Sequence, residues 1–261
     1  MSALAAEAMQ TVVALARAVA AEGEAIGLPY VAASADIGSP DPMRGPDGAP
    51  LAETVFRWLD PGLRYWEDRA FALRSAFVHA ARASAEPFYF SGGRLATWRP
   101  SPVLEAINAG GPIEAFGVGS ALIAPAYQPY GVIGAVLWAS PETKVDVRAV
   151  FEARAAELHL LALKLMSLYA EARLGTVAAP VRLTRREIQC LKWAAAGKTD
   201  GDIAQIVQIS VPTVRFHVTN AARKLGAPGR SQAIHRAAAL GYIGGDGPEG
   251  VARPVRRNPT R

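Results

Sequence analysis

Residues 181–243 read VRLTRREIQCLKWAAAGKTDGDIAQIVQISVPTVRFHVTNAARKLGAPGRSQAIHRAAALGYI, and this stretch decides the fold of the C-terminal third. Thr184 followed three residues later by Glu187 is a capping box, the pair of side chains that begins a helix. We expect this helix to end before Gly197, because glycine tolerates the left-handed backbone found after the last helical turn. A second, short helix is expected over 200–207.

A third helix is expected next, because Ser210 is a suitable N-cap and Pro212 falls in the first turn that would follow it. It should run to Lys224 and be terminated by Gly226, with a fourth helix over 231–240. Two short helices joined by a tight turn, the second of them basic at its exposed positions, are the pattern of a helix-turn-helix domain.

The charge distribution agrees with this interpretation. Residues 181–261 carry 14 basic and 5 acidic side chains, net +9, whereas residues 1–180 carry 14 and 18, net −4. A basic segment behind a near-neutral body predicts a nucleic-acid-binding domain joined to another domain. Apolar residues at 51% exclude disorder of the whole chain, and a single cysteine excludes an intramolecular disulfide framework.

The third helix should have one buried face and one DNA-facing face. Its buried face is predicted from the apolar residues three or four apart: Val214, Val218, Ala221 and Leu225. Arg215, Thr219 and Arg223 then share the opposite face, with Phe216 beside them. N-terminal residues of a recognition helix reach base edges, so Arg215 is the first candidate for a bidentate guanine contact. The alternative is that Arg215 and Arg223 are solvated surface charges.

The segment resembles the DNA-binding domain of LuxR-type transcription regulators. The matching motifs are Leu183-Thr184-x-Arg186-Glu187, Gly197-Lys198-Thr199, Ile203-Ala204, Ile209-Ser210, Thr213-Val214 and Lys224-Leu225. Trp193 and Phe216-His217-Val218-x-Asn220-Ala221 further resemble the quorum-sensing branch. Asp202 departs from the glutamate usual in the family, a change that should leave the fold intact.

The resemblance implies a homodimer that binds double-stranded DNA at an inverted-repeat operator and acts with the transcription machinery. Base contacts are expected from Arg215, Phe216 and Thr219, with Phe216 against a thymine methyl group. Phosphate contacts, which give affinity but no sequence information, are expected from Lys198, Thr199, Arg223, Lys224, Arg230 and Ser231.

The first 174 residues should form a mixed α/β domain. Expected elements are a helix over 3–22, a loop over 36–50, one or two helices over 63–85, a strand over 88–90, a hairpin over 116–140 and a long helix over 143–174. Residues 175–180 read as a linker, 181–243 as the DNA-binding domain and 244–261 as a disordered basic tail. Helices over a sheet are the expected architecture.

The quorum-sensing branch joins its four-helix DNA-binding domain to an α-β-α sandwich that binds acyl-homoserine lactones and dimerises, and the order of elements here is compatible with that fold. Counting from Pro87-Phe88, the family's ligand-binding aspartate falls on Ser75 and its pocket tryptophan on Gly62. Serine brings no charge, and an unpaired buried donor on the ligand costs about 1–3 kcal/mol. A lactone ligand is therefore compatible with the sequence but not required by it.

The candidate pocket residues are Tyr65, Trp66, Ser75, Phe88 and Phe90. Aromatic residues at helix and strand spacing are also typical of a hydrophobic core, and this alternative stays open. Trp58 is an aromatic residue that could take up the space left at Gly62, although its spacing does not match the family.

Two functions remain open for the N-terminal domain. It senses a small apolar signal, acyl-homoserine-lactone-like or other, or it is a ligand-independent dimerisation or protein-interaction module. No enzyme or cofactor site is expected, because the four histidines have no metal-ligand spacing and no phosphate-binding glycine loop is present. Prolines and glycines interrupt the uncharged stretch 115–141, so we do not expect it to cross a membrane. The apolar segment 1–21 lacks the basic start of a signal peptide, so we expect a cytoplasmic protein.

Overall fold

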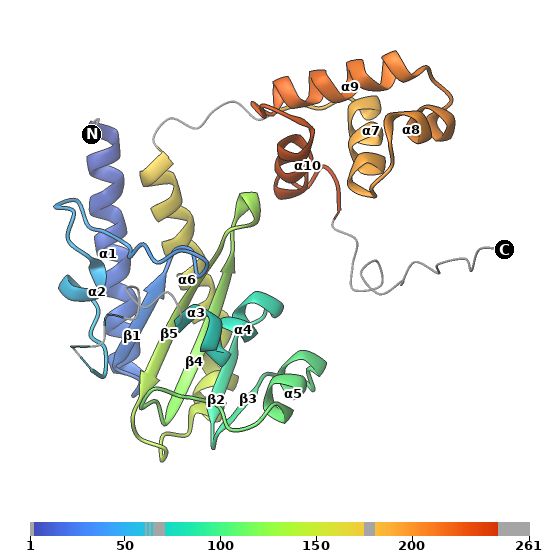
Figure 1. Ribbon diagram of the computed structural model, residues 1–261. Coiled ribbons are helices and arrows are strands. Elements are labelled where there is room, and N and C mark those ends of the chain that lie inside the picture. Colours follow the sequence, from blue (N-terminus) through green and yellow to red (C-terminus); the bar gives the residue numbers. More distant parts are fainter. Residues whose placement is uncertain (1–2, 61, 63, 65–70, 175–180, 245–261) are drawn as a thin grey trace. The chain divides into compact units, whose positions relative to one another are not determined.

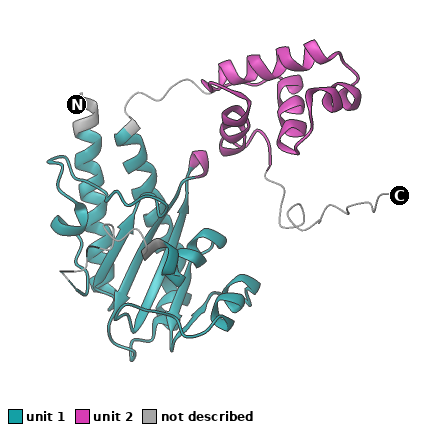
Figure 2. Ribbon diagram, in the orientation of Figure 1, with its two compact units in different colours: residues 1–128, 132–177 teal, residues 129–131, 178–261 magenta. Residues whose placement is uncertain are grey.

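The computed structural model describes residues 3–60, 62, 64, 71–174 and 181–244. The chain divides into two compact units, residues 1–128 with 132–177 and residues 129–131 with 178–261 (Figure 2). The linker expected over 175–180, almost all of the expected tail, and the pocket candidates Tyr65 and Trp66 lie outside the described residues.

The N-terminal unit is built on a five-stranded antiparallel sheet with the strand order β1-β5-β4-β2-β3 (Figure 1). The strands are β1 (Tyr30–Ser34), β2 (Phe88–Ser91), β3 (Arg94–Ala96), β4 (Ser120–Tyr127) and β5 (Ile133–Ser140). The predicted hairpin is confirmed: β4 and β5 pair from Ser120 opposite Ser140 to Tyr127 opposite Ile133, around the 3-10 turn Pro129–Gly131. Strand β1 was not predicted.

Two long helices, α1 (Ala3–Ala25) and α6 (Val147–Leu174), cover one face of this sheet (Figure 1). Their buried residues pack against those of β1, β4 and β5 that point to the same face, among them Leu122 and Trp138. The indole Nε1 of Trp138 donates a hydrogen bond of 2.9 Å to the carbonyl of Val19, which joins β5 to α1. Helix α6 begins later than predicted because Asp146 caps its start, with Oδ1 accepting from the N–H of Ala149 at 3.0 Å.

Short helices cover the opposite face of the sheet. The predicted segment 63–85 contains, within its described part, α3 (Phe71–Arg74) and α4 (Ala76–Ala83), which are separated at Ser75. Helix α5 (Pro102–Ala109), which was not predicted, packs beside α4. The single-turn helix α2 (Leu51–Thr54) belongs to the other face, because its Leu51 is buried in the core with residues of α1 and α6. With helices on both faces, the unit is the α-β-α sandwich expected from the sequence.

The second unit contains the four predicted helices. They are α7 (Arg185–Ala195), α8 (Asp200–Val207), α9 (Val211–Lys224) and α10 (Arg230–Ala239). Capping boxes begin α7 and α8, the hydroxyl of Ser210 caps α9, and Gly197 and Gly226 follow α7 and α9 with positive φ angles of 78° and 62°. These local signals set the helix ends, so the predicted bounds differ from the observed ones by no more than one or two residues.

Among the described helices, none combines the length and the apolar composition needed to cross a bilayer.

Candidate nucleic-acid interface and ligand pocket

Helix α9 has the two faces that the spacing predicted. Val214 and Ala221 are fully buried, and Val218 and Leu225 are nearly so. Arg215, Phe216 and Thr219 are exposed on the other side. Phe216 is 62% exposed, an uncommon position for a large apolar side chain, and it leaves an aromatic ring beside Arg215 on the outer surface of the helix. This surface therefore offers a guanidinium, an aromatic ring and a hydroxyl group for contact with a partner.

Two of the residues predicted to contact phosphates are engaged within the domain. Lys224 Nζ donates to Glu187 Oε2 at 2.8 Å, and this lysine side chain is only 34% exposed. Arg230 Nη1 pairs with Asp200, and Arg230 Nη2 donates to the carbonyl of Lys198 at 2.6 Å. These two cations join α9 to α7 and α10 to α8.

The other four candidates for phosphate contact lie at the surface. Lys198 and Ser231 are exposed, and Arg223 is exposed with its Nη2 donating to Asn220 at 3.2 Å. Thr199 is the N-cap of α8, where its hydroxyl donates to Asp202 Oδ2 at 2.7 Å. Lys198 and Thr199 therefore mark the N-terminus of α8, which carries the positive end of a helix dipole.

Glu187 is the buried carboxylate of the capping box. Burial by itself raises the pKa of this carboxyl, but the hydrogen bonds from Lys224 and Thr184 outweigh burial and lower its pKa. The predicted capping box is confirmed, because the N–H of Thr184 donates to Glu187 Oε2 at 2.7 Å and the N–H of Glu187 donates to the hydroxyl of Thr184. Cys190 is fully buried in the hydrophobic core of the same domain.

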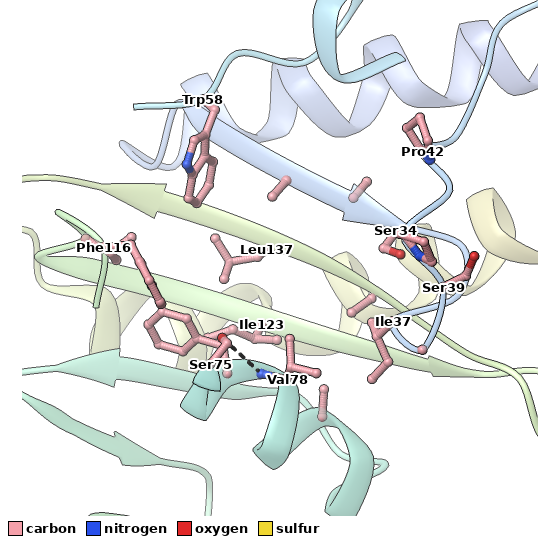
Figure 3. Close-up of a pocket in the computed structure, with 18 of the residues that line it drawn as sticks. Ser34, Ile37, Ser39, Pro42, Trp58, Ser75, Val78, Phe116, Ile123 and Leu137 are labelled. Atoms are coloured by element: carbon pink, nitrogen blue, oxygen red, sulfur yellow. Dashed lines mark hydrogen bonds between the residues drawn. The ribbon is translucent and has the colours of Figure 1, made fainter. Parts of the chain in front are cut away.

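The N-terminal unit contains a cavity of about 500 Å³ between the sheet and α4 (Figure 3). It lies on the face of the sheet that the short helices cover. Its walls come from three strands, from the start of α4 and from three loop segments. The lining residues include Ser39, Asp41, Trp58, Ser75 and Ala135.

Ser75 is the one predicted pocket residue that lines this cavity within the described part of the chain. It is fully buried at the N-cap of α4, where its Oγ accepts from the N–H of Val78 at 3.4 Å (Figure 3). Phe88 and Phe90 are buried in the neighbouring hydrophobic core and are not among the lining residues. Gly62 is exposed, whereas Trp58 does line the cavity.

The segment 37–42 forms a wall of the cavity that the sequence did not predict. It was expected only as a loop, but the N–H of Ile37 donates to the carbonyl of Ile133 at 2.8 Å and fixes the segment to β5. Within it, Ser39 Oγ accepts from the N–H of Asp41 at 3.2 Å. Asp41 brings the one ionisable side chain among the described residues that line the cavity. No group of His, Cys, Asp or Glu in the described part of the chain could hold a metal ion.

The buried face of α9, its exposed basic and aromatic face and the tight turn after α8 define a helix-turn-helix DNA-binding domain. Residues 181–237 match the family described as bacterial regulatory proteins, luxR family. The C-terminal domain is thus a LuxR-family DNA-binding domain, as the motifs predicted.

The curated relatives match over a minor part of this chain. The transcriptional activator protein VanR of Vibrio anguillarum is 56% identical over 61 residues, which are 23% of this chain and 25% of that protein. The quorum sensing-dependent transcriptional regulator RpaR of Rhodopseudomonas palustris is 45% identical over 87 residues, 31% of this chain and 36% of that protein. The chain therefore covers between a quarter and little more than a third of these relatives.

Solved structures of SdiA are similar over more of the chain. Escherichia coli SdiA is 23% identical, covers 69% of this chain and 73% of its own, and has a TM-score of 0.42. SdiA in complex with octanoyl-rac-glycerol is 19% identical, with coverages of 90% and 91% and a TM-score of 0.46.

We expect Glu187→Gln to destabilise the DNA-binding domain by about 1–3 kcal/mol at neutral pH, because the charge-assisted bonds from Lys224 and Thr184 weaken. The pKa of Glu187 is lower in the folded than in the unfolded chain. This stabilisation is therefore complete above the unfolded pKa, about 4.3, and is lost as the pH falls through the folded value.

Hydrogen exchange of the α7 and α9 amides, compared at pH 7 and at about pH 3.5 and corrected for the intrinsic rate, measures this difference. The difference in opening free energy between wild type and variant should be smaller at the lower pH. An equal difference in opening free energy at both pH values would contradict the assigned role of the carboxylate charge.

Proposed function

We propose that the chain is a sequence-specific DNA-binding transcription regulator whose N-terminal domain binds a small, neutral, mainly apolar molecule. The observation that carries the proposal is the LuxR-family domain with Arg215, Phe216 and Thr219 on the exposed face of α9. The similarity to VanR, a transcriptional activator protein, and to RpaR, a quorum sensing-dependent transcriptional regulator, supports it.

In this proposal the exposed face of α9 enters the major groove, which is wide enough to admit a helix. Arg215 donates to the O6 and N7 atoms of a guanine, Phe216 packs against a thymine methyl group, and Thr219 makes a further base contact. Phosphate contacts come from the exposed candidates, Lys198, Thr199, Arg223 and Ser231. Lys224 and Arg230, predicted as phosphate contacts, act here mainly through their partners inside the domain.

We expect Arg215→Ala to remove the preference for guanine at one base pair in each half-site, a loss of about 1–3 kcal/mol of discrimination. Because Arg215 is 71% exposed, the fold should be preserved. The measurement is a gel-shift series on DNA recovered from a randomised pool by the wild-type chain. Arg186→Ala, which removes an exposed arginine from α7, is the matched control. Unchanged selectivity in Arg215→Ala would rule out the base contact.

The cavity supports small-molecule binding because about 500 Å³ falls within the usual range for ligand pockets, about 300–1,000 Å³. No lysine, arginine or histidine lines it in the described part of the chain, so an anionic ligand would find no counter-charge there. An acyl-homoserine lactone or another neutral apolar signal fits this environment. The competing proposal, a ligand-independent interaction module, leaves the cavity without a role.

We expect a ligand present at 100 times its Kd to raise the melting temperature by about 5–10 °C, since it stabilises the folded state by about 2.7 kcal/mol. The measurement is a thermal melt against a panel of acyl-homoserine lactones and other apolar signals, with mass spectrometry of an organic extract. Ala135→Phe adds a ring inside the cavity and should abolish the shift.

Ala106→Phe is the matched control, because it adds the same ring to the exposed side of α5. A protein that yields no extractable compound, responds to no signal in the panel and still binds DNA would favour the ligand-independent module.

Homodimerisation belongs to the same proposal, because an inverted repeat presents two half-sites to a two-fold symmetric protein. The exposed side of α6 carries Ala149, Ala153, Ala156 and Leu160 at helical spacing, and Leu160 is 53% exposed. We propose this stripe as the dimer contact.

We expect Leu160→Glu to convert the dimer to a monomer, because it places a carboxylate in an apolar contact. In a two-fold symmetric dimer the substitution occurs once in each copy, so both copies bring a charge to the contact. Light scattering after size-exclusion chromatography gives the mass. Leu73→Glu, the same substitution at a leucine that is 70% exposed on α3, should leave the mass unchanged. A wild-type monomer, or a dimeric Leu160→Glu variant, would eliminate this contact.

A further inference from the structure

Asp200, the first residue of α8, pairs with one arginine of α9 and one arginine of α10. Its Oδ2 accepts from Arg215 Nε of α9 at 3.2 Å, and its Oδ1 pairs with Arg230 Nη1 of α10. The Asp200 side chain is only 24% exposed, whereas Arg215 is 71% exposed. The Asp200 carboxylate is therefore partly buried, and the Arg215 side chain that it contacts extends into solvent.

The orientation of Asp200 is fixed from the opposite side. Arg230 uses one amino group for the carboxylate and the other for the carbonyl of Lys198, at 2.6 Å. Each oxygen of Asp200 thus has one cationic partner, so the carboxylate cannot turn without breaking one of the pairs. A fixed acceptor restricts the torsions of the long side chain bonded to it.

The bond to Asp200 uses one particular part of the Arg215 guanidinium. Arginine has five N–H donors in a planar fork, and the hydrogen bond to Asp200 engages Nε. The two terminal amino groups, Nη1 and Nη2, remain at the outer end of the fork. A pair of parallel donors at that end matches the O6 and N7 acceptors of guanine.

We infer that Asp200 is a positioning residue for sequence recognition: it holds Arg215 by Nε so that the terminal amino groups face a guanine. The inference rests on the proposed base contact of Arg215. Asp200 also places a negative charge near the DNA phosphates, which opposes binding to any DNA regardless of sequence. Asp200 therefore increases discrimination and decreases non-specific affinity, a pair of opposite effects that a purely structural carboxylate would not produce.

The test uses the full-length chain and DNA that the wild-type protein selects from a randomised double-stranded pool. Fluorescence anisotropy on a series of single-base-pair changes first identifies the base pair at which Arg215→Ala loses discrimination. At that base pair, Asp200→Asn is expected to lower the preference for guanine by at least about fivefold, the low end for one bidentate contact. The same variant should bind unrelated DNA more tightly than wild type does.

Asp202→Asn is the matched control, because it removes one negative charge from the same turn of α8. Asp202 bonds to Thr199 and contacts neither arginine. It should strengthen binding to unrelated DNA while leaving the guanine preference at the wild-type value. A purely electrostatic role of Asp200 would make the two variants identical.

Each outcome separates this inference from the proposed function. If Arg215→Ala loses the guanine preference and Asp200→Asn keeps it, the positioning role is wrong and the base contact stands. If Arg215→Ala itself keeps the preference, the base contact fails and the positioning role fails with it. A wild-type chain that selects no DNA sequence would overturn both.

Asp200→Asn also leaves Arg230 without its carboxylate, so a thermal melt must show that the variant is folded. If it is not, the comparison moves to Asp200→Asn with Arg230→Gln against Arg230→Gln alone, because the less exposed of the two cations, at position 230, is then absent from both chains. The guanine preference should again fall only in the chain that lacks Asp200, and equal preferences would overturn the inference.

Discussion

The N-terminal domain depends on the burial of strand β4 on both faces of the sheet. All its residues from 120 to 126 are buried, with Leu122 pointing toward α1 and α6 and Ile123 toward the short helices. A central strand that is apolar on both sides requires a covering layer on each side. The helices of the domain form these two layers, and the helices of one layer are much longer than those of the other.

This inequality gives the domain its cavity. One layer consists of helices of 23 and 28 residues, which span the sheet and fill that side. The other layer contains two helices of eight residues and shorter turns, which cannot cover the same area. Small residues on the strands, such as Ala32 and Ala135, leave space beneath that layer, and the segment 37–42 and Trp58 enclose it. A pocket of ligand size thus follows from short covering helices over a complete sheet.

The sequence predicted best what local interactions determine. The ends of α7, α8 and α9 follow from hydroxyl caps and glycines within a few residues of each end, so no tertiary information was needed. Helix α5 carries the same signals, a capping Ser101 before Pro102, and could have been found from them. Strand β1 reads YVAAS, in which only Tyr30 and Val31 favour a strand; its full length is a strand because it pairs with β5.

The pocket divides in the same way between local and long-range causes. Ser75 was placed by counting along a motif, and it lines the cavity because it caps the helix that forms one wall. The wall at 37–42 depends on a hydrogen bond between Ile37 and Ile133, residues far apart in the sequence, and no pattern in the loop reports that bond. Composition likewise predicted a basic surface, but it could not show which basic side chains are paired with carboxylates inside the domain. Lys224 and Arg230 are neutralised by Glu187 and Asp200, so the domain uses part of its positive charge to hold its helices together. A count of basic residues therefore overstates the charge that has no carboxylate partner inside the domain, and even Arg215, the proposed base contact, shares Asp200 with Arg230.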